Sequence, residues 1–336
     1  MRIAKTLLLS ALCALALGLS TPAHAVVIKI GTIAPKGSTW HKALVDMASK
    51  WEAASGGKIK VRIYPGGIAG DEGAMVTKMR IGQLNAAAIS AVGLHDITPE
   101  PQALAVPELI RSYDELDAVM AKVGPELEKA LADKGFQVLT WSDAGFIYFF
   151  TKDPVSTPSQ MANEPIFAWA GDPKAEAAWR AAGFKPVVIS STEMIPSLQS
   201  GLIKAFTTSA LLSLSVGWYR YAPNMPDISW GILPGAVVVD KKTWDRIAPE
   251  LQQKLLTIAH DTGTALRASL RKQSGEATAA MKKNGLNVIA LTPAQKALWI
   301  KAAESSYPVI RGGSVPAGIF DQVKKVAADY RASHKK

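Results

Sequence analysis

The chain has 336 residues, of which 48% are hydrophobic and 20% charged, and its formal net charge is +10 at pH 7. This length is enough for a large buried core and favours two domains or lobes. The single cysteine, Cys13, excludes an internal disulfide and a zinc site built from several thiolates. No basic-aromatic motif accompanies the positive charge, so nucleic acid is not an expected partner.

The first 25 residues have the pattern of a secretion signal. Arg2 and Lys5 form a positive start, residues 6–19 form an apolar stretch, and Ala23-His24-Ala25 fits a small-x-small cleavage site. The apolar stretch is shorter than the roughly 20 residues of a membrane span. We therefore predict export to the periplasm, with cleavage after Ala25.

Strands alternate with helices in the next part of the chain. Residues 27–31 predict a strand, and the apolar spacing within residues 40–54 predicts a helix. Residues 58–64 alternate polar and apolar side chains and predict a second strand. Asp71 is suited to cap the following helix, and residues 86–91 predict a third strand. This alternation indicates an α/β fold.

A second unit begins near Gly145 in our prediction. Apolar runs at residues 146–151, 166–169 and 187–189 predict buried strands, and helices are expected over residues 173–182 and 193–200. Residues 236–239 predict a strand that returns to the first unit, and residues 249–283 predict the longest helix. We therefore expect one lobe from residues 26–144 plus 235–265, and the other from residues 145–234 plus 266–336.

Motifs for enzymatic chemistry are incomplete. The glycine-rich stretch at residues 66–70 follows a strand, but a G-x-G-x-x-G loop would need a glycine where Pro65 stands. Neither G-x-S-x-G nor H-E-x-x-H occurs. The histidines after the signal are far apart in sequence: His41, His95, His260 and His334. We predict that the protein is not an enzyme and holds neither a cofactor nor a metal.

Four motifs follow one another along the chain. Residues 64–72 resemble a "YP-x-x-x-LG-[DE]-[DE]" turn, and residues 156–161 resemble "pv-x-tP-x-DL". Residues 193–201 resemble "E-[VM]-Y-x-A-L-Q-x-G", and residues 241–247 resemble "SKK-x-W-x-x-L". In this order the chain, from residue 27 to about residue 330, resembles the substrate-binding subunits of tripartite ATP-independent periplasmic (TRAP) transporters of the dicarboxylate-receptor (DctP) type.

The resemblance implies a two-lobed periplasmic binding protein fold, with mixed sheets in each lobe and one long helix that crosses both. It implies a small-molecule ligand in the cleft between the lobes, which close over it. The implied partners are the permease subunits of a TRAP transporter, and a helical-repeat lipoprotein is a further candidate partner.

The chain departs from the family where the family places two arginines in the cleft. Ile147 and Phe167 stand at these two positions, and Thr208 replaces an asparagine. A hydrogen bond to a charged group contributes about 1.5–3 kcal/mol, so two lost contacts correspond to about 3–6 kcal/mol. We therefore expect a neutral, aromatic or hydrophobic ligand. Two alternatives remain open: a conventional organic acid held by another cation, and a periplasmic shuttle for lipids or other hydrophobes.

The candidate ligand-binding residues combine the positions implied by the resemblance with the aromatic and polar side chains near them. Strand alternation places Trp169 on the same face as Phe167. The candidates are Ile33, Trp40, Glu72, Ser90, Ile147, Phe167, Trp169, Ser191, Thr208 and Trp218.

Overall fold

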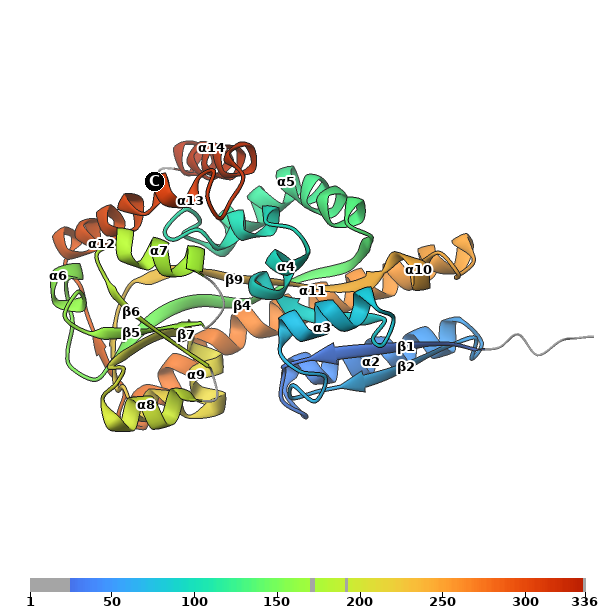
Figure 1. Ribbon diagram of the computed structural model, residues 1–336, viewed down its shortest axis with the longest axis horizontal. Helices are drawn as coiled ribbons and strands as arrows, with labels where there is room; N and C mark the ends of the chain where they lie inside the picture. Colours follow the sequence, from blue (N-terminus) through green and yellow to red (C-terminus); the bar gives the residue numbers. More distant parts are fainter. Residues whose placement is uncertain (1–24, 170–172, 191–192, 335–336) are drawn as a thin grey trace, which may run out of the picture.

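The computed structural model describes residues 25–169, 173–190 and 193–334 (Figure 1). The strands are β1 Val26–Thr32, β2 Ile59–Tyr64, β3 Ala86–Ser90, β4 Phe136–Thr151, β5 Pro165–Trp169, β6 Lys185–Ile189, β7 Ala205–Ser209, β8 Asn224–Pro226, β9 Ser229–Asp240 and β10 Asn287–Ile289. The helices of the first half are α2 Thr39–Ala54, α3 Glu72–Arg80, α4 Ala91–Ile97, the 3-10 helix η1 Glu100–Ala105, α5 Tyr113–Asp133 and α6 Pro158–Met161. Those of the second half are α7 Pro173–Ala181, α8 Met194–Ser200, α9 Ala210–Val216, η3 Trp218–Arg220, α10 Lys241–Trp244, α11 Pro249–Lys283, α12 Pro293–Ser305, α13 Tyr307–Ile310 and α14 Ala317–Ser333.

The strands form one sheet with the order β2-β1-β3-β9-β4-β7-β5-β6, and β8 and β10 extend it beside β4. β1 is parallel to β2 and β3, whereas β9 is antiparallel to β3. β5 is parallel to β6 and β7, whereas β4 is antiparallel to β7. We call the part built on β1, β2 and β3 lobe I, and the part built on β5, β6 and β7 lobe II. Each lobe therefore has mixed strand directions, as predicted.

Three long elements connect the lobes. β4 pairs with β9 from Phe136, opposite Asp240, to Tyr148, opposite Ser229. α11 packs against α2 and α9 and runs from one lobe to the other (Figure 1). The prediction of a long helix across both lobes is confirmed. The exact lobe bounds stay a prediction, because α14, expected in lobe II, packs against α5, expected in lobe I.

Two local contacts stabilise lobe I: one caps α3, and the other joins α2 to α11. Asp71 caps α3 by accepting a hydrogen bond from the backbone nitrogen of Ala74 at 2.8 Å, as its sequence position predicted. Such a cap stabilises a helix by about 1 kcal/mol. Trp51 of α2 is fully buried, and its indole nitrogen donates to the carbonyl of Leu255 in α11 at 2.9 Å. This contact fixes α2, and with it the strands beneath, to the crossing helix.

Aromatic rings fill the centre of lobe II. Phe149 of β4 is fully buried, and four rings lie 4.9 to 6.1 Å from it, measured between ring centroids. These rings are Trp179, Phe184, Trp230 and Trp299. Aromatic pairs contribute about 0.5–1.5 kcal/mol beyond the burial of their area. The aromatic content of this lobe is therefore largely a packing feature.

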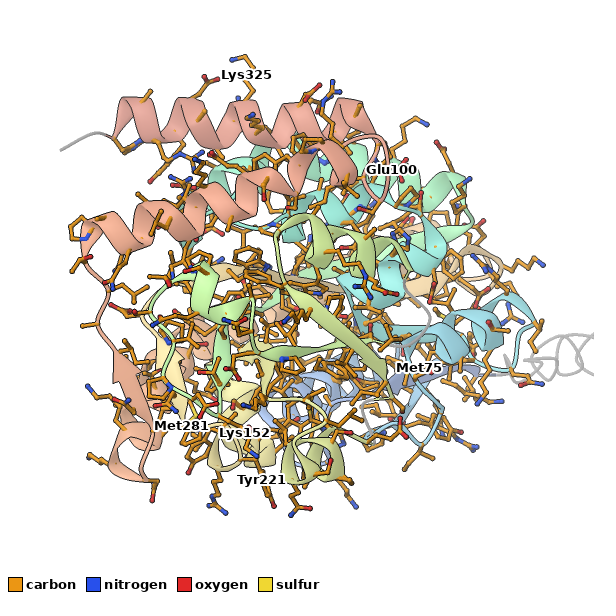
Figure 2. The ribbon with its side chains drawn as sticks, turned by 60° about the vertical axis from the view of Figure 1, so that its left-hand side comes forward. Met75, Glu100, Lys152, Tyr221, Met281 and Lys325 are labelled. Carbon is orange, nitrogen blue, oxygen red and sulfur yellow. The ribbon has the colours of Figure 1, made fainter. Side chains whose placement is uncertain are left out.

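Both lobes have dense interiors, as the side chains drawn in Figure 2 show. Met75 of α3 and Met281 of α11 are fully buried, whereas Lys325 of α14 projects outward. Within residues 25–169, 173–190 and 193–334, no helix combines the length and the hydropathy that a membrane span requires. The predicted secretion signal lies outside these described residues, apart from Ala25.

Candidate functional site

The carboxyl ends of β1 and β3 border a cavity of about 150 Å³, which we call the strand-end cavity. Lobe I contributes residues 32–35 and Ser90, and lobe II contributes Leu212 of α9. The crossing elements complete the wall with Ser142 and Ala144 of β4, residues 233–237 of β9 and Leu266 of α11. Ligands of α/β proteins bind outside the carboxyl ends of the strands, so this position is suited to a ligand.

Glu72 is the one ionisable side chain among the described residues that line the strand-end cavity. Its Oε1 atom accepts a hydrogen bond from the backbone nitrogen of Ser90 at 2.9 Å. Its Oε2 atom accepts from the Ser90 hydroxyl at 2.7 Å and from the backbone nitrogen of Gly93 at 2.8 Å. Burial raises the pKa of the Glu72 carboxyl, and these hydrogen bonds lower it by less. Glu72 and Ser90 therefore join α3 to the start of α4 within the cavity wall.

A second cavity, of about 160 Å³, lies between α4 and η1 of lobe I and α7 of lobe II. We call it the tryptophan cavity, because the stacked rings of Trp179 and Trp230 line it, with centroids 5.7 Å apart and an interplanar angle of 12°. Ile147 of β4 also lines it. Among the described residues that line the tryptophan cavity, His95 of α4 is the one ionisable residue. Its buried Nδ1 atom has no hydrogen-bond partner among the described residues.

Five of the ten predicted site residues line these cavities. Ile33, Trp40, Glu72 and Ser90 lie at the strand-end cavity, whereas Ile147 lies at the tryptophan cavity. We expected these five side chains to share one pocket. The structure instead assigns them to two separate cavities that both lie between the lobes.

Four of the other predicted residues lie outside both linings. Phe167 is only 4% exposed, because its ring packs within the apolar core of lobe II. This core includes Met194 and Leu198 of α8. Trp169 is 46% exposed, and its ring meets that of Phe167 edge-on at 5.2 Å, so the predicted shared face is confirmed. Phe167 is therefore a core residue, and its contact with a ligand stays a prediction.

Thr208 is buried in lobe II, and the partly buried Trp218 packs against its core. Thr208 is 5% exposed and stands opposite Tyr148 in the pairing of β7 with β4. Trp218 packs edge-on against Phe206, with centroids 5.7 Å apart. Ser191, the tenth predicted residue, lies outside the described residues.

No lysine or arginine lines either cavity in the part of the chain that the structure describes. Two lysines of lobe II have other partners. Lys152 donates to the carbonyl of Leu198 at 3.1 Å, and Lys204 pairs with Asp153 at 3.0 Å. The described walls therefore offer apolar surface and hydrogen-bonding groups, with Glu72 and His95 as their ionisable side chains.

The comparison with protein families agrees with this two-lobed architecture. Residues 30–311 match the family described as bacterial extracellular solute-binding protein, family 7 (DctP). The chain belongs to this family. It is a TRAP-type periplasmic solute-binding subunit, a transport protein rather than an enzyme, and such subunits work with membrane permease subunits. The resemblance drawn from the four motifs is confirmed.

Relatives and solved structures show how widely this fold is shared. The 2,3-diketo-L-gulonate-binding periplasmic protein YiaO of Escherichia coli (strain K12) is 24% identical over 69% of this chain and 71% of its own. A TRAP solute-binding protein from Ralstonia eutropha with bound (S)-2-acetolactate has a TM-score of 0.83 at 20% identity and covers 91% of this chain and 100% of its own. One from Pseudomonas putida F1 with bound D-glucuronate has a TM-score of 0.81 at 24% identity, with 90% and 97% covered. None of these likenesses supports a helical-repeat lipoprotein partner for this chain.

Sequence reasoning missed several cavity residues, among them Ser142, Ala144 and Leu212. One usable signal was the Pro234-Gly235 pair, which interrupts the apolar strand β9. A Cβ atom at Gly235 would lie 2.8 Å from the carbonyl oxygen of Ile89, so the glycine allows β9 to approach β3 closely. This close approach is where the wall of the strand-end cavity forms.

Proposed function

We propose that the solute of this TRAP-type receptor is a small organic acid, bound between the lobes at the strand-end cavity. The observation that carries this proposal is the solute class of the similar proteins, which include structures with bound D-glucuronate, β-D-galacturonate and succinate. This revises our expectation of a neutral or hydrophobic ligand in favour of the organic-acid alternative.

The strand-end cavity supports such a solute in two ways. Its volume of about 150 Å³ is similar to that of an engineered apolar cavity that holds benzene, so it suits a small molecule. Glu72 in its wall has a raised pKa because it is buried. In its protonated form, a carboxyl group donates a hydrogen bond and so is a partner for the carboxylate of a solute.

Binding of an acid is therefore coupled to proton uptake at Glu72. The negative charge of the solute disfavours ionised Glu72 and raises the pKa of its carboxyl further. Since the complex then holds more protons than the free protein, affinity for an acid rises as the pH falls toward the raised pKa of the Glu72 carboxyl. Glu72→Gln, which cannot titrate, should abolish this pH dependence.

A second candidate is a neutral aromatic or hydrophobic solute. It is favoured by the absence of lysine and arginine from the described linings of both cavities. The lipid shuttle alternative has no support among these similar proteins, whose bound solutes are small organic acids. We therefore do not propose the shuttle alternative further.

Matched pairs of acids and uncharged amides distinguish the two candidates. We would titrate the protein calorimetrically with D-glucuronate and D-glucuronamide, and with succinate and succinamide, at about pH 8 and about pH 5. The organic-acid proposal predicts that at least one acid binds at least about tenfold more tightly than its amide, and more tightly at the lower pH. Equal or tighter binding of the amides, without pH dependence, would establish the neutral solute instead.

A further inference from the structure

A polar cluster lies where β4 passes from lobe I to lobe II, and we call it the hinge cluster. It consists of Tyr113 and Asp117 of α5, Asp143 of β4 and Arg271 of α11. The pairing of β4 with β9 is irregular between Asp143 and Phe146, and Gly145 has a backbone φ of 89°. Only glycine adopts such a φ readily, so this is a place where the strand bends.

Arg271 is shared between the two carboxylates of the hinge cluster. Its Nη1 and Nη2 atoms donate to Asp117 at 2.8 and 2.7 Å, and Nη2 also donates to Asp143 at 3.3 Å. The guanidinium group lies over the ring of Tyr113, 4.5 Å from its centroid. The Asp117 side chain is 55% exposed, whereas that of Asp143 is 1% exposed. Asp143 is therefore the buried partner: burial raises the pKa of its carboxyl, and Arg271 opposes this shift.

The residues on either side of Asp143 form part of the strand-end cavity. Ser142 and Ala144 both line it. Asp143 stands between them in β4 and bonds to Arg271, so the cavity wall and the hinge cluster share this short segment of the strand. α11 also holds the residue before Ser142, because Arg267 donates to the carbonyl of Trp141 at 2.7 Å.

We propose that Asp143 is a positioning residue of the solute site, which holds the wall segment 142–144 in place through its bond to Arg271. A shift of α11 against β4 changes how Arg271 is divided between Asp143 and Asp117. The cluster thereby couples the position of the cavity wall to the relative position of the lobes. This inference rests on the strand-end cavity as the solute site, but its test requires no solute.

The test measures how readily a small reagent reaches the cavity from solution. Leu212→Cys places a thiol on the lobe II side of the cavity, away from the hinge cluster, and iodoacetamide labelling at position 212 is followed by peptide mass spectrometry. Ala303→Cys, at a fully buried position of α12, reports global opening. Asp143→Asn is compared with the matched control Asp117→Asn, because both remove one charged partner of Arg271.

We expect Asp143→Asn, which removes the charge but keeps an acceptor oxygen, to accelerate labelling at position 212 about tenfold, the lower end of the range for loss of one hydrogen bond to a charged group. Labelling at position 303 should be unchanged, and Asp117→Asn should alter the rate at position 212 by less than about twofold. Arg271→Lys, which cannot reach both carboxylates as a fork does, should act like Asp143→Asn and serves if that variant does not fold. An unchanged rate at position 212, or an equal increase at positions 212 and 303, overturns the proposal.

Discussion

Substitution of Phe167 by arginine tests whether this position belongs to the core or to the ligand cleft. The resemblance predicts that this position takes the place of a ligand-binding arginine, but the structure places Phe167 within the apolar core of lobe II, 4% exposed. Removal of a buried phenylalanine ring costs about 3–5 kcal/mol. An unpaired buried charge adds about another 3–5 kcal/mol. The sum is comparable with the whole unfolding free energy of a typical domain, about 5–15 kcal/mol.

We therefore expect Phe167→Arg to be largely unfolded or strongly destabilised in urea unfolding followed by circular dichroism. The matched control is Ile147→Arg, at the other family arginine position, because Ile147 is half-buried beside the tryptophan cavity. There the longer side chain has free volume to enter, and we expect a loss of only about 1–3 kcal/mol. A Phe167→Arg variant with the same urea midpoint as the parent protein would refute the core assignment and return position 167 to the cleft.

Two further predictions concern stability. Glu108 is buried, which raises the pKa of its carboxyl from 4.5 to about 7, although the guanidinium of Arg111 at 3.1 Å opposes the shift. Between these two pKa values the native state holds a proton at Glu108 that the unfolded state has lost. The unfolding free energy should therefore fall with rising pH by at most about 1.4 kcal/mol per pH unit. Glu108→Gln should flatten this slope. Gly263 and Gly275 both lie in α11, but a Cβ atom at Gly263 would lie 1.9 Å from Thr140 Oγ1, whereas one at Gly275 meets nothing within 4 Å. In thermal unfolding, Gly263→Ala should be destabilised by about 1–3 kcal/mol, whereas Gly275→Ala should be stabilised by up to about 1 kcal/mol. The same effect at both positions would contradict this packing of α11 on β4.

The fold was predictable from the sequence because its signals are local. Periodicity alone identified the α/β alternation, and the absence of internal proline identified α11 before any contact was known. The cap at Asp71 was predictable for the same reason, since its hydrogen bond joins residues three positions apart. Long-range pairing, in contrast, was not visible: nothing in the sequence indicates that β4 continues through both lobes as one strand of 16 residues.

The candidate site was only partly predictable, because it depends on which face of each strand meets which lobe. Ile33 follows β1 and Ser90 ends β3, and the carboxyl ends of both strands border the cavity. The packing of Phe167 could not be predicted, because a position in a strand does not determine which side chains cover it, and its ring lies in the core of lobe II. The role of Asp143 had no sequence signal, since Arg271 is 128 residues away along the chain.

The location and class of the solute are tested most directly by a crystal structure of the protein with the tightest-binding member of the acid and amide panel. We predict density for an organic acid between the lobes, in contact with Glu72 and Ser90 and enclosed by residues 32–35 and the Pro234-Gly235 segment. Density for an amide at the same place would contradict the organic-acid class. Density for any solute only in the tryptophan cavity or on the outer surface would contradict the strand-end cavity as the site.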